Sequence, residues 1–228
     1  MRKIALLVLL CQFQKINAEN LIGGKVSKRY PEVVLITSGR GMCSASLIGP
    51  NTLVTAGHCI DKNTMEVSFE KGQGSCKYHP QWIDRSQGLI DLALCKINRI
   101  KLDRYAKVAE ENEMPKKGEK ILLTGYGCTS GDQRYIDGNY RIGYSKVTKL
   151  PRGLTPEFWT EGSTALCFGD SGGPAFKRGT HKIYGINSKG DIKRISIMVS
   201  IGDPRVYDFL HEFIKSEDAL VCGINISC

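Results

Sequence analysis

Short segments rich in β-branched and aliphatic residues recur along this 228-residue chain, and turn-forming residues separate them. Gly, Pro, Asn and Asp supply the separators, as in Gly49-Pro50-Asn51. Many short strands at such spacing are typical of an all-β sandwich or barrel. The pattern predicts strands at 32–38, 44–48, 52–55, 65–70, 89–98, 120–125, 139–150, 182–187 and 195–201.

The C-terminal region carries a helical pattern instead. Asp208 is a favourable N-cap residue, and four apolar residues after it fall on one helical face: Phe209, Leu210, Phe213 and Ile214. We therefore expect a terminal helix that begins after Asp208. The composition, 41% hydrophobic and 24% charged, is that of a globular protein and argues against disorder.

The first twenty residues have the organisation of a secretory signal. Basic Met1-Arg2-Lys3 precedes an apolar run at 4–10, and Ala18 offers a cleavage point. The apolar run is too short to span a membrane. We expect a secreted protein, extracellular or periplasmic, with no membrane association after the signal is removed.

The chain has nine cysteines, and removal of Cys11 with the signal leaves eight. An even number of cysteines in an exported chain argues for disulfides. Because no Cys-x-x-Cys pair is present, a zinc site is not indicated. We expect no metal and no cofactor.

The formal charge is +9, and removal of residues 1–20 leaves 29 basic and 22 acidic residues, 29 − 22 = +7. A basic surface can attract acidic proteins, glycans or nucleic acid. No run of basic residues exceeds two, which favours dispersed charges on a soluble protein. We expect no specific nucleic-acid partner.

Residues 167–174 read Cys-Phe-Gly-Asp-Ser-Gly-Gly-Pro. A serine between glycines suits a strained turn that exposes one hydroxyl, since glycine permits positive φ and a close approach of the substrate backbone. The N–H groups of Gly169 and Ser171 could point at one spot, as an oxyanion hole requires. A single Gly-x-Ser-x-Gly string is a weak signal by itself.

A serine hydroxyl becomes a good nucleophile only when a neighbouring base takes its proton. The segment 55–59 supplies His58, and the apolar run 89–94 contains Asp91. A carboxylate in an apolar run is costly unless it is hydrogen-bonded, and holding a catalytic imidazole is one such arrangement. The chain order is His58, Asp91, Ser171.

Four motifs together resemble the chymotrypsin/trypsin-like serine peptidases, whose triad has this same order. The motifs are Leu-Ile-Gly-Gly (21–24), Thr-Ala-Gly-His-Cys (55–59), Asp-Leu-Ala-Leu (91–94) and Gly-Asp-Ser-Gly-Gly-Pro (169–174). The resemblance covers essentially everything after residue 20. It implies two six-stranded antiparallel β-barrels with the active site between them and a C-terminal α-helix. The implied division is a signal peptide and short propeptide at 1–20, one barrel at 21–115, and a second barrel with the helix at 116–228.

The resemblance also implies the catalytic roles. Ser171 attacks the substrate carbonyl, His58 transfers the proton, Asp91 orients the imidazole, and the N–H groups of Gly169 and Ser171 form the oxyanion hole. The expected protein is a monomeric serine endopeptidase that acts through an acyl-enzyme on protein or peptide substrates and meets protein inhibitors. The segment 67–79 is too short and too poor in acidic residues for the calcium loop of some relatives.

By resemblance, Cys43 and Cys59 form the bridge beside the catalytic histidine. The other pairs are left open by the sequence. Cys76 with Cys95 is expected on adjacent strands, and Cys128 with Cys167 in two loops that flank the active site. Cys222 and Cys228 remain for the tail.

Activation in this family places a freshly cut N-terminus against the aspartate before the nucleophile, which here implies Leu21 and Asp170. The residue before Leu21 is Asn20 rather than the usual Arg or Lys. If signal peptidase cuts after Ala18, a dipeptide remains, which resembles the propeptide of granzymes.

Substrate selection is expected in the segments on either side of the nucleophile. Ala165, six residues before Ser171, stands at the base of the primary pocket, followed by Leu166 and Phe168. The missing carboxylate there disfavours cleavage after Lys or Arg. The family's substrate-pairing Ser-Trp-Gly appears as Ser188, Lys189 and Gly190.

Residues 204–207, Pro-Arg-Val-Tyr, resemble the family's Pro-Gly-Val-Tyr, whose glycine lines the back of the pocket. This match predicts Arg205 in the pocket, as in granzyme B, and cleavage after Asp or Glu. The alternative is that Arg205 turns outward or fills the pocket, because 195–201 resembles an insertion that would move the pocket wall.

The alternative function is that of a catalytically silent protein with a peptidase fold that binds through its basic surface. Retention of His58 and Ser171 argues against it. The sequence leaves open whether Asn225 in Asn-Ile-Ser is glycosylated.

Overall fold

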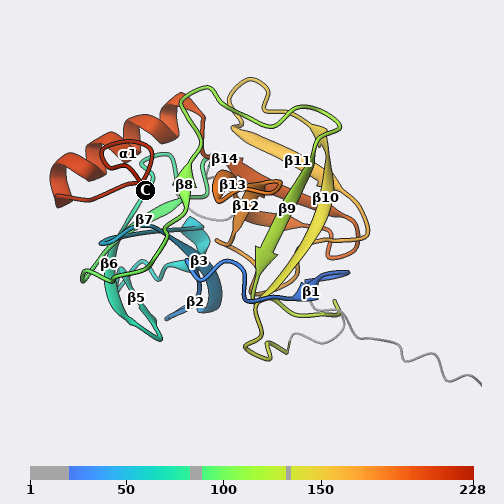
Figure 1. Ribbon diagram of the computed structural model, residues 1–228, viewed down its shortest axis with the longest axis horizontal. Coiled ribbons are helices and arrows are strands. Elements are labelled where there is room, and N and C mark those ends of the chain that lie inside the picture. Colours follow the sequence, from blue (N-terminus) through green and yellow to red (C-terminus); the bar gives the residue numbers. More distant parts are fainter. Residues whose placement is uncertain (1–20, 83–88, 132–134) are drawn as a thin grey trace, which may run out of the picture.

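The computed structural model describes residues 21–82, 89–131 and 135–228. The signal peptide and propeptide predicted for 1–20 lie outside these residues. The described chain forms two closed six-stranded antiparallel β-barrels and a C-terminal α-helix, which confirms the fold expected from the motifs (Figure 1).

The first barrel closes in the order β2-β3-β4-β7-β6-β5. Its interior is lined by aliphatic side chains that alternate along the strands, among them Ile36, Leu47, Leu53 and Val67. The strands are β2 (Val33–Ser38), β3 (Gly41–Gly49), β4 (Thr52–Thr55), β5 (Glu66–Phe69), β6 (Gly72–Tyr78) and β7 (Ala93–Ile97).

The second barrel runs β10-β11-β14-β13-β12-β9 and is closed by pairing of β9 with β10. Buried Phe158, Phe176, Ile186 and Met198 contribute to its core. The strands are β9 (Lys120–Gly125), β10 (Arg141–Lys149), β11 (Glu157–Glu161), β12 (Pro174–Lys177), β13 (Lys182–Gly190) and β14 (Ile195–Ser200).

Two short strands from the first half of the chain join the second sheet. β1 (Lys25–Val26) pairs with β10, and β8 (Lys107–Val108) runs parallel to β13. The first barrel ends with β7 and the second begins with β9, so we propose the connection near residue 115 as the division between them.

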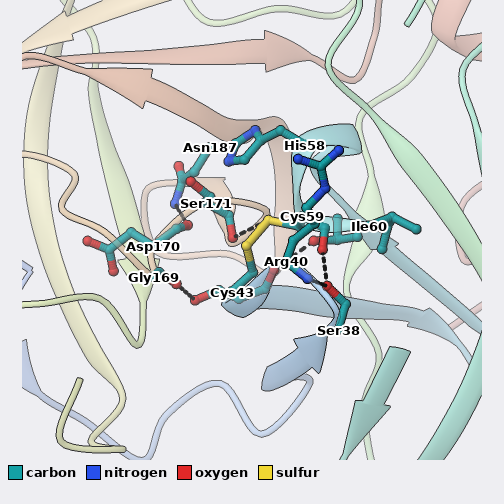
Figure 2. Close-up of a disulfide and its surroundings, with 12 residues drawn as sticks. Ser38, Arg40, Cys43, His58, Cys59, Ile60, Gly169, Asp170, Ser171 and Asn187 are labelled. Atoms are coloured by element: carbon teal, nitrogen blue, oxygen red, sulfur yellow. Dashed lines mark hydrogen bonds between the residues drawn. A yellow bond between two sulfur atoms is a disulfide. The ribbon is translucent and has the colours of Figure 1, made fainter. Parts of the chain in front are cut away.

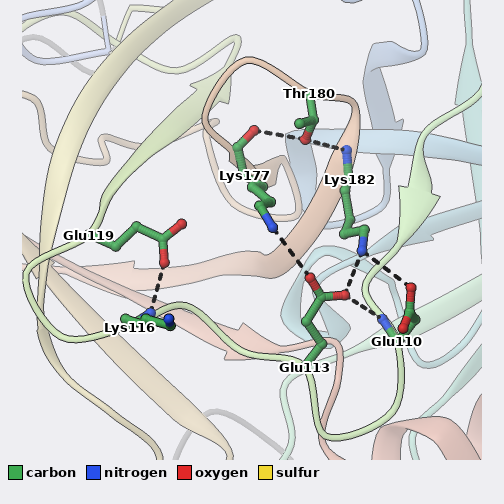
Figure 3. Close-up of polar contacts among 7 residues, drawn as sticks. All are labelled: Glu110, Glu113, Lys116, Glu119, Lys177, Thr180 and Lys182. Carbon is green, nitrogen blue, oxygen red and sulfur yellow. Dashed lines mark hydrogen bonds and ion pairs between the residues drawn. The ribbon is translucent and has the colours of Figure 1, made fainter.

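Ion pairs fasten this connection to the second barrel (Figure 3). Glu113 binds Lys182 at 2.6 Å and Lys177 at 3.7 Å, and Lys182 also reaches Glu110 at 3.5 Å. The connecting segment is thereby held against β12 and β13 rather than left as a free linker.

The terminal helix α1 (Pro204–Glu217) starts earlier than expected. Asp203 is its N-cap and accepts the Arg205 N–H at 3.0 Å, while Asp208 lies inside the helix. Pro204 explains the early start, because proline favours the first helical position, where no N–H is needed. Phe209, Phe213 and their neighbours bury one face, as the apolar spacing predicted.

Helix α1 follows the second barrel in sequence but packs on the first (Figure 1). Lys77 of β6 donates to Ser216 Oγ at 3.2 Å, and the ring of Phe209 meets His79 edge-on. In the part of the chain that the structure describes, no helix is long and apolar enough to cross a membrane.

Four disulfides join the eight cysteines after residue 20, in the pairs expected. They are Cys43–Cys59, Cys76–Cys95, Cys128–Cys167 and Cys222–Cys228. The first and third flank the loop that carries Ser171.

Candidate active site

The loop between β11 and β12 presents Ser171 to the first barrel. Gly169 and Gly172 have φ values of +98° and +81°, which side chains disfavour. A Cβ at Gly172 would lie 2.0 Å from Thr55 Oγ1 and 2.3 Å from the Ser44 carbonyl oxygen. Glycine is therefore required for the loop to touch β3 and β4.

His58 lies in the short 3-10 helix η1 (Gly57–Cys59), directly after β4. Its Nδ1 is 2.7 Å from Asp91 Oδ2, and its backbone N–H donates to Asp91 Oδ1 at 2.8 Å. A Cβ at Gly57 would lie 2.9 Å from the Trp82 ring, so glycine lets that ring pack beside η1. The Asp91 carboxylate thus holds His58 at two points, the imidazole Nδ1 and the backbone N–H.

Asp91 is 6% exposed and receives a further hydrogen bond from Ser188 Oγ at 2.6 Å. Burial alone would raise the pKa of this carboxyl, but the hydrogen bonds and charge of His58, together with Ser188, lower it below its ordinary value. Asp91 is consequently ionised at neutral pH. The bond from Ser188 was not foreseen, because the sequence places that residue in a substrate-pairing strand.

A cavity of about 470 Å³ opens between the barrels, and both His58 and Ser171 line it. Figure 2 shows both residues around the Cys43–Cys59 disulfide, whose Cys59 Sγ lies 3.6 Å from the Ser171 carbonyl oxygen. Other predicted site residues that line the cavity are Asp91, Leu166, Phe168, Gly169, Ser188, Lys189 and Gly190. Lining residues that sequence reasoning missed are Arg40, Met42, Trp82, Ile136, Glu157 and Ile192.

The backbone N–H groups of Gly169 and Ser171 are available at this cavity. Within the described residues neither donates to another protein group, whereas the N–H of Asp170 between them bonds the Cys167 carbonyl at 3.1 Å. Unpaired donors at a cavity can receive a developing oxyanion.

Asp170 is fully buried behind the nucleophile. Its carboxylate accepts the N–H of Gly127 and of Cys167, both at 2.8 Å. Burial raises the pKa of Asp170 to about 7, against the lowering effect of the two N–H donors and of Arg141. Arg141 is itself bound to Asp137 at 2.6 Å, so Asp170 lacks a dedicated cation in the described structure.

The N-terminal segment runs beside this loop. Leu21 is fully buried, and the Ile22 carbonyl accepts the Ala165 N–H at 2.9 Å. Ile22, the residue after Leu21, is therefore held beside Ala165, which lies five residues before Asp170 in the sequence.

Leu166 and the end of β13 line the cavity, and β14 pairs with β13 beside them; Ala165, predicted at the base of the pocket, is not among the described lining residues. Leu166 N–H donates to Ser196 Oγ at 3.0 Å, and a Cβ at Gly190 would lie 2.4 Å from the Ile195 carbonyl oxygen. Ala165 itself is fully buried.

Lys189 Nζ pairs with Glu157 at 2.8 Å. Because both residues line the cavity, the positive charge of Lys189 is compensated there by Glu157.

The predicted position of Arg205 needs correction. Its guanidinium binds Asp203 at 2.9 Å and the Leu154 carbonyl at 2.7 Å, and Arg205 is not among the described residues that line the cavity. Residues 195–200 form strand β14, as the strand pattern predicted, and this strand pairs with both β11 and β13, so the segment that the resemblance marked as an insertion is part of the second barrel. Asp203 and Pro204 then start helix α1, where the motif match expected Arg205 to line the back of the pocket.

Cys43, His58 and Cys59 bring three ligand-type atoms within 4.8 Å of one another. Both sulfur atoms belong to one disulfide, so neither is a thiolate that could bind a metal. The disulfide instead fixes the backbone beside His58.

Comparison with known proteins finds serine proteases among the proteins similar to this chain. Human serine protease 1 is 26% identical over 224 residues, covering 86% of this chain and 87% of that protein. The structure of mouse brain neuropsin, a serine protease, aligns with a TM-score of 0.69 at 19% identity, covering 84% of this chain and 98% of that one. Human heparin binding protein also has a TM-score of 0.69, at 17% identity, with 85% and 96% covered. Structural likeness at these identities shows the fold alone.

Residues 21–202 match the family described as trypsin. The match spans well over half of the chain and contains every motif that points to the cavity. The protein therefore belongs to the trypsin family.

Proposed function

We propose that the protein is a secreted serine endopeptidase that cleaves peptide bonds through an acyl-enzyme on Ser171. The observation that carries the proposal is the convergence of Ser171 and His58 on one cavity, with the ionised Asp91 2.7 Å from His58 Nδ1. Its partners would be protein or peptide substrates and protein inhibitors, met as a monomer. The four disulfides are consistent with an oxidising compartment.

The chemistry follows from these positions. His58 takes the proton of Ser171 Oγ as that oxygen bonds to the substrate carbonyl carbon, and the carbonyl oxygen becomes an oxyanion. The Gly169 and Ser171 N–H groups receive this charge, an interaction worth roughly 3 kcal/mol per donor. His58 then gives the proton to the amine as the C–N bond breaks, and water repeats the sequence to release the acid. Asp91 stabilises the imidazolium throughout.

We infer an uncharged, apolar side chain for the primary pocket. Ala165 offers no carboxylate to a basic residue, and the one from Glu157 is paired with Lys189. Arg205 is bound to Asp203, so cleavage after Asp or Glu has no support from this arrangement. Leu166 and Ile192 supply apolar surface in the cavity.

A peptide library tests both activity and specificity. The chain beginning at Leu21 should cleave after apolar residues at least tenfold faster than after Lys or Arg, and Ser171→Ala should be inactive. Main cleavage after basic residues would refute the specificity. Equal cleavage by Ser171→Ala would refute the mechanism.

Activation is proposed to need removal of residues up to Asn20. A free Leu21 ammonium would supply the cation that buried Asp170 lacks, and pairing there would order the loop that carries the oxyanion donors. The chain beginning at Glu19 should therefore be nearly inactive beside the chain beginning at Leu21. Equal activity of the two would contradict this step.

The alternative of a catalytically silent binding protein is not favoured. Heparin binding protein shares the fold, and this chain carries a formal charge of +9. However, the present chain keeps His58, Asp91 and Ser171 together with the unpaired N–H donors. These residues have no evident purpose in charge-based binding.

A further inference from the structure

We propose that Ser44 is a positioning residue, whose hydroxyl fixes the oxyanion hole of the proposed peptidase. Ser44 belongs to β3 of the first barrel and is fully buried. Its side chain touches no part of the cavity, so any effect on the reaction must pass through the backbone of the nucleophile loop. This inference rests on the proposed function of Ser171.

The hydroxyl of Ser44 forms two buried hydrogen bonds. It donates to the Gly169 carbonyl at 2.8 Å and accepts the Tyr126 N–H at 3.0 Å. Tyr126 directly follows β9 of the second barrel. One hydroxyl on the first barrel therefore joins the nucleophile loop to the second.

The backbone of Ser44 makes further bonds to the same region. Its N–H donates to the Ser171 carbonyl at 2.8 Å, and its carbonyl accepts the Thr55 hydroxyl at 2.9 Å. Thr55 ends β4, three residues before His58, and Cys43 is joined to Cys59 on the other side of that histidine. Figure 2 shows Cys43, Gly169 and Ser171 gathered around this disulfide.

Gly169 needs such a restraint because of its backbone. At φ +98° it has no side chain to limit its torsions, so the adjoining peptide planes can rotate. The carbonyl held by Ser44 belongs to the peptide between Gly169 and Asp170, which lies between the two oxyanion donors. Within the described residues, Ser44 Oγ is the only side-chain group bonded to that carbonyl.

The next peptide is already secured by other groups. The Asp170 carbonyl accepts the Gly173 N–H at 3.0 Å and the Asn187 amide at 3.1 Å. The Gly169 side keeps the bond from the Cys128 N–H to the Phe168 carbonyl at 2.8 Å and that from the Asp170 N–H to the Cys167 carbonyl at 3.1 Å. Loss of the Ser44 hydroxyl should therefore loosen, rather than release, the Gly169 side of the hole and leave the Ser171 side in place. The Ser44 hydroxyl would thus preorganise one of the two oxyanion donors, the Gly169 N–H.

The chain offers a matched control two residues along the same strand. Ser46 is also fully buried, and its hydroxyl has no hydrogen-bond partner in the described structure. Ser44→Ala and Ser46→Ala remove the same atom from the same strand, but only the first removes a bond to Gly169. If the Ser44 hydroxyl served stability alone, the two variants would differ in thermal unfolding but not in kcat per titrated site.

The experiment uses the full chain beginning at Leu21, with active sites titrated by a fluorophosphonate and folding checked by thermal unfolding. Ser44→Ala should lower kcat about tenfold with KM within about twofold, and Ser46→Ala should leave both unchanged. Ser44→Gly, which also lacks the hydroxyl, serves if Ser44→Ala does not fold. Ser44→Thr keeps the hydroxyl and should retain most of kcat.

A peptidyl trifluoromethyl ketone gives the direct readout, since its hemiketal with Ser171 places an oxyanion in the hole. The pKa of that hemiketal, followed by ¹⁹F NMR, should rise by about one unit in Ser44→Ala, which matches a tenfold loss. An unchanged pKa and unchanged kcat per titrated site would overturn the proposal while the proposed function stands. A wild-type chain with neither activity nor labelling at Ser171 would refute the function itself, and the role of Ser44 with it.

Discussion

Two buried aspartates, Asp91 and Asp170, flank the nucleophile and have opposite electrostatic environments. Asp91 gains hydrogen bonds from His58 and Ser188 that lower its pKa despite burial. Asp170 has two backbone N–H donors and no dedicated cation, and burial raises its pKa to about 7. The Asp91 carboxylate is therefore stabilised in its charged form, whereas the charged form of Asp170 is not balanced by a dedicated cation in the described structure.

The raised pKa of Asp170 predicts how stability depends on pH. Between the ordinary carboxyl pKa of 3.8 and about 7, the folded chain holds a proton that the unfolded chain releases. This contribution is therefore present below about pH 4 and is lost as pH rises through 7, by on the order of 4 kcal/mol at most. Urea unfolding of the chain beginning at Glu19 should show the loss, and Asp170→Asn should abolish it. A free Leu21 ammonium should reduce the loss, and identical pH profiles for all three chains would contradict this account.

Most of the candidate site could be predicted from sequence because its chemistry demands particular residues in short motifs. His58, Asp91, Ser171 and Gly169 belong to this group. Ser44 could not be found this way, since its role depends on contact with a loop 125 residues further along the chain. A serine in a strand carries no signal of that contact.

At the scale of elements, the barrel strands rich in β-branched residues were predictable, and the three other barrel strands, β6, β11 and β12, were not. β6 begins at Gly72 and contains Gly74, and β12 begins at Pro174, the last residue of the nucleophile motif. β11 contains charged residues at both ends. The predicted strand 89–98 begins only at Ala93, because Asp91 leaves the sheet to reach His58. Pairing with neighbouring strands, rather than local β-propensity, determines where these segments form strands.

The start of α1 gives a prediction about Arg205. Because its guanidinium is bound to the N-cap Asp203, Arg205→Ala should leave the preference for the residue before the cleaved bond unchanged. It should cost about 1 kcal/mol of stability, similar to the loss of the cap in Asp203→Ala. Library cleavage and urea unfolding of both variants provide the measurement. If Arg205→Ala cleaved less after acidic residues than the wild type does, Arg205 would contribute to the primary pocket, contrary to the structure.

At the scale of the whole molecule, the active site depends on the two barrels keeping their relative position. Tyr126 beside the second barrel donates its hydroxyl to the Val33 carbonyl of the first at 3.1 Å. Glu32, before β2, pairs with His181, before β13. Glu32 is fully buried, and its second oxygen has no partner within the described residues.

Breaking the Glu32–His181 pair should therefore destabilise the molecule. Removal of one partner from a buried pair leaves an uncompensated charge, so His181→Ala should cost about 3 kcal/mol. His211→Ala on the exposed face of α1 is the control, with less than about 0.5 kcal/mol expected. Urea unfolding measures both, and equal losses would show that the inter-barrel pair contributes nothing specific.

The most direct measurement of the central claim is covalent labelling of the chain beginning at Leu21 with a fluorophosphonate, read by intact mass and peptide mapping. One adduct on Ser171 is predicted, with labelling strongly slowed in His58→Ala and absent in Ser171→Ala. No adduct on the folded wild-type chain, or equal labelling of wild type and His58→Ala, would contradict the claim that these residues work together.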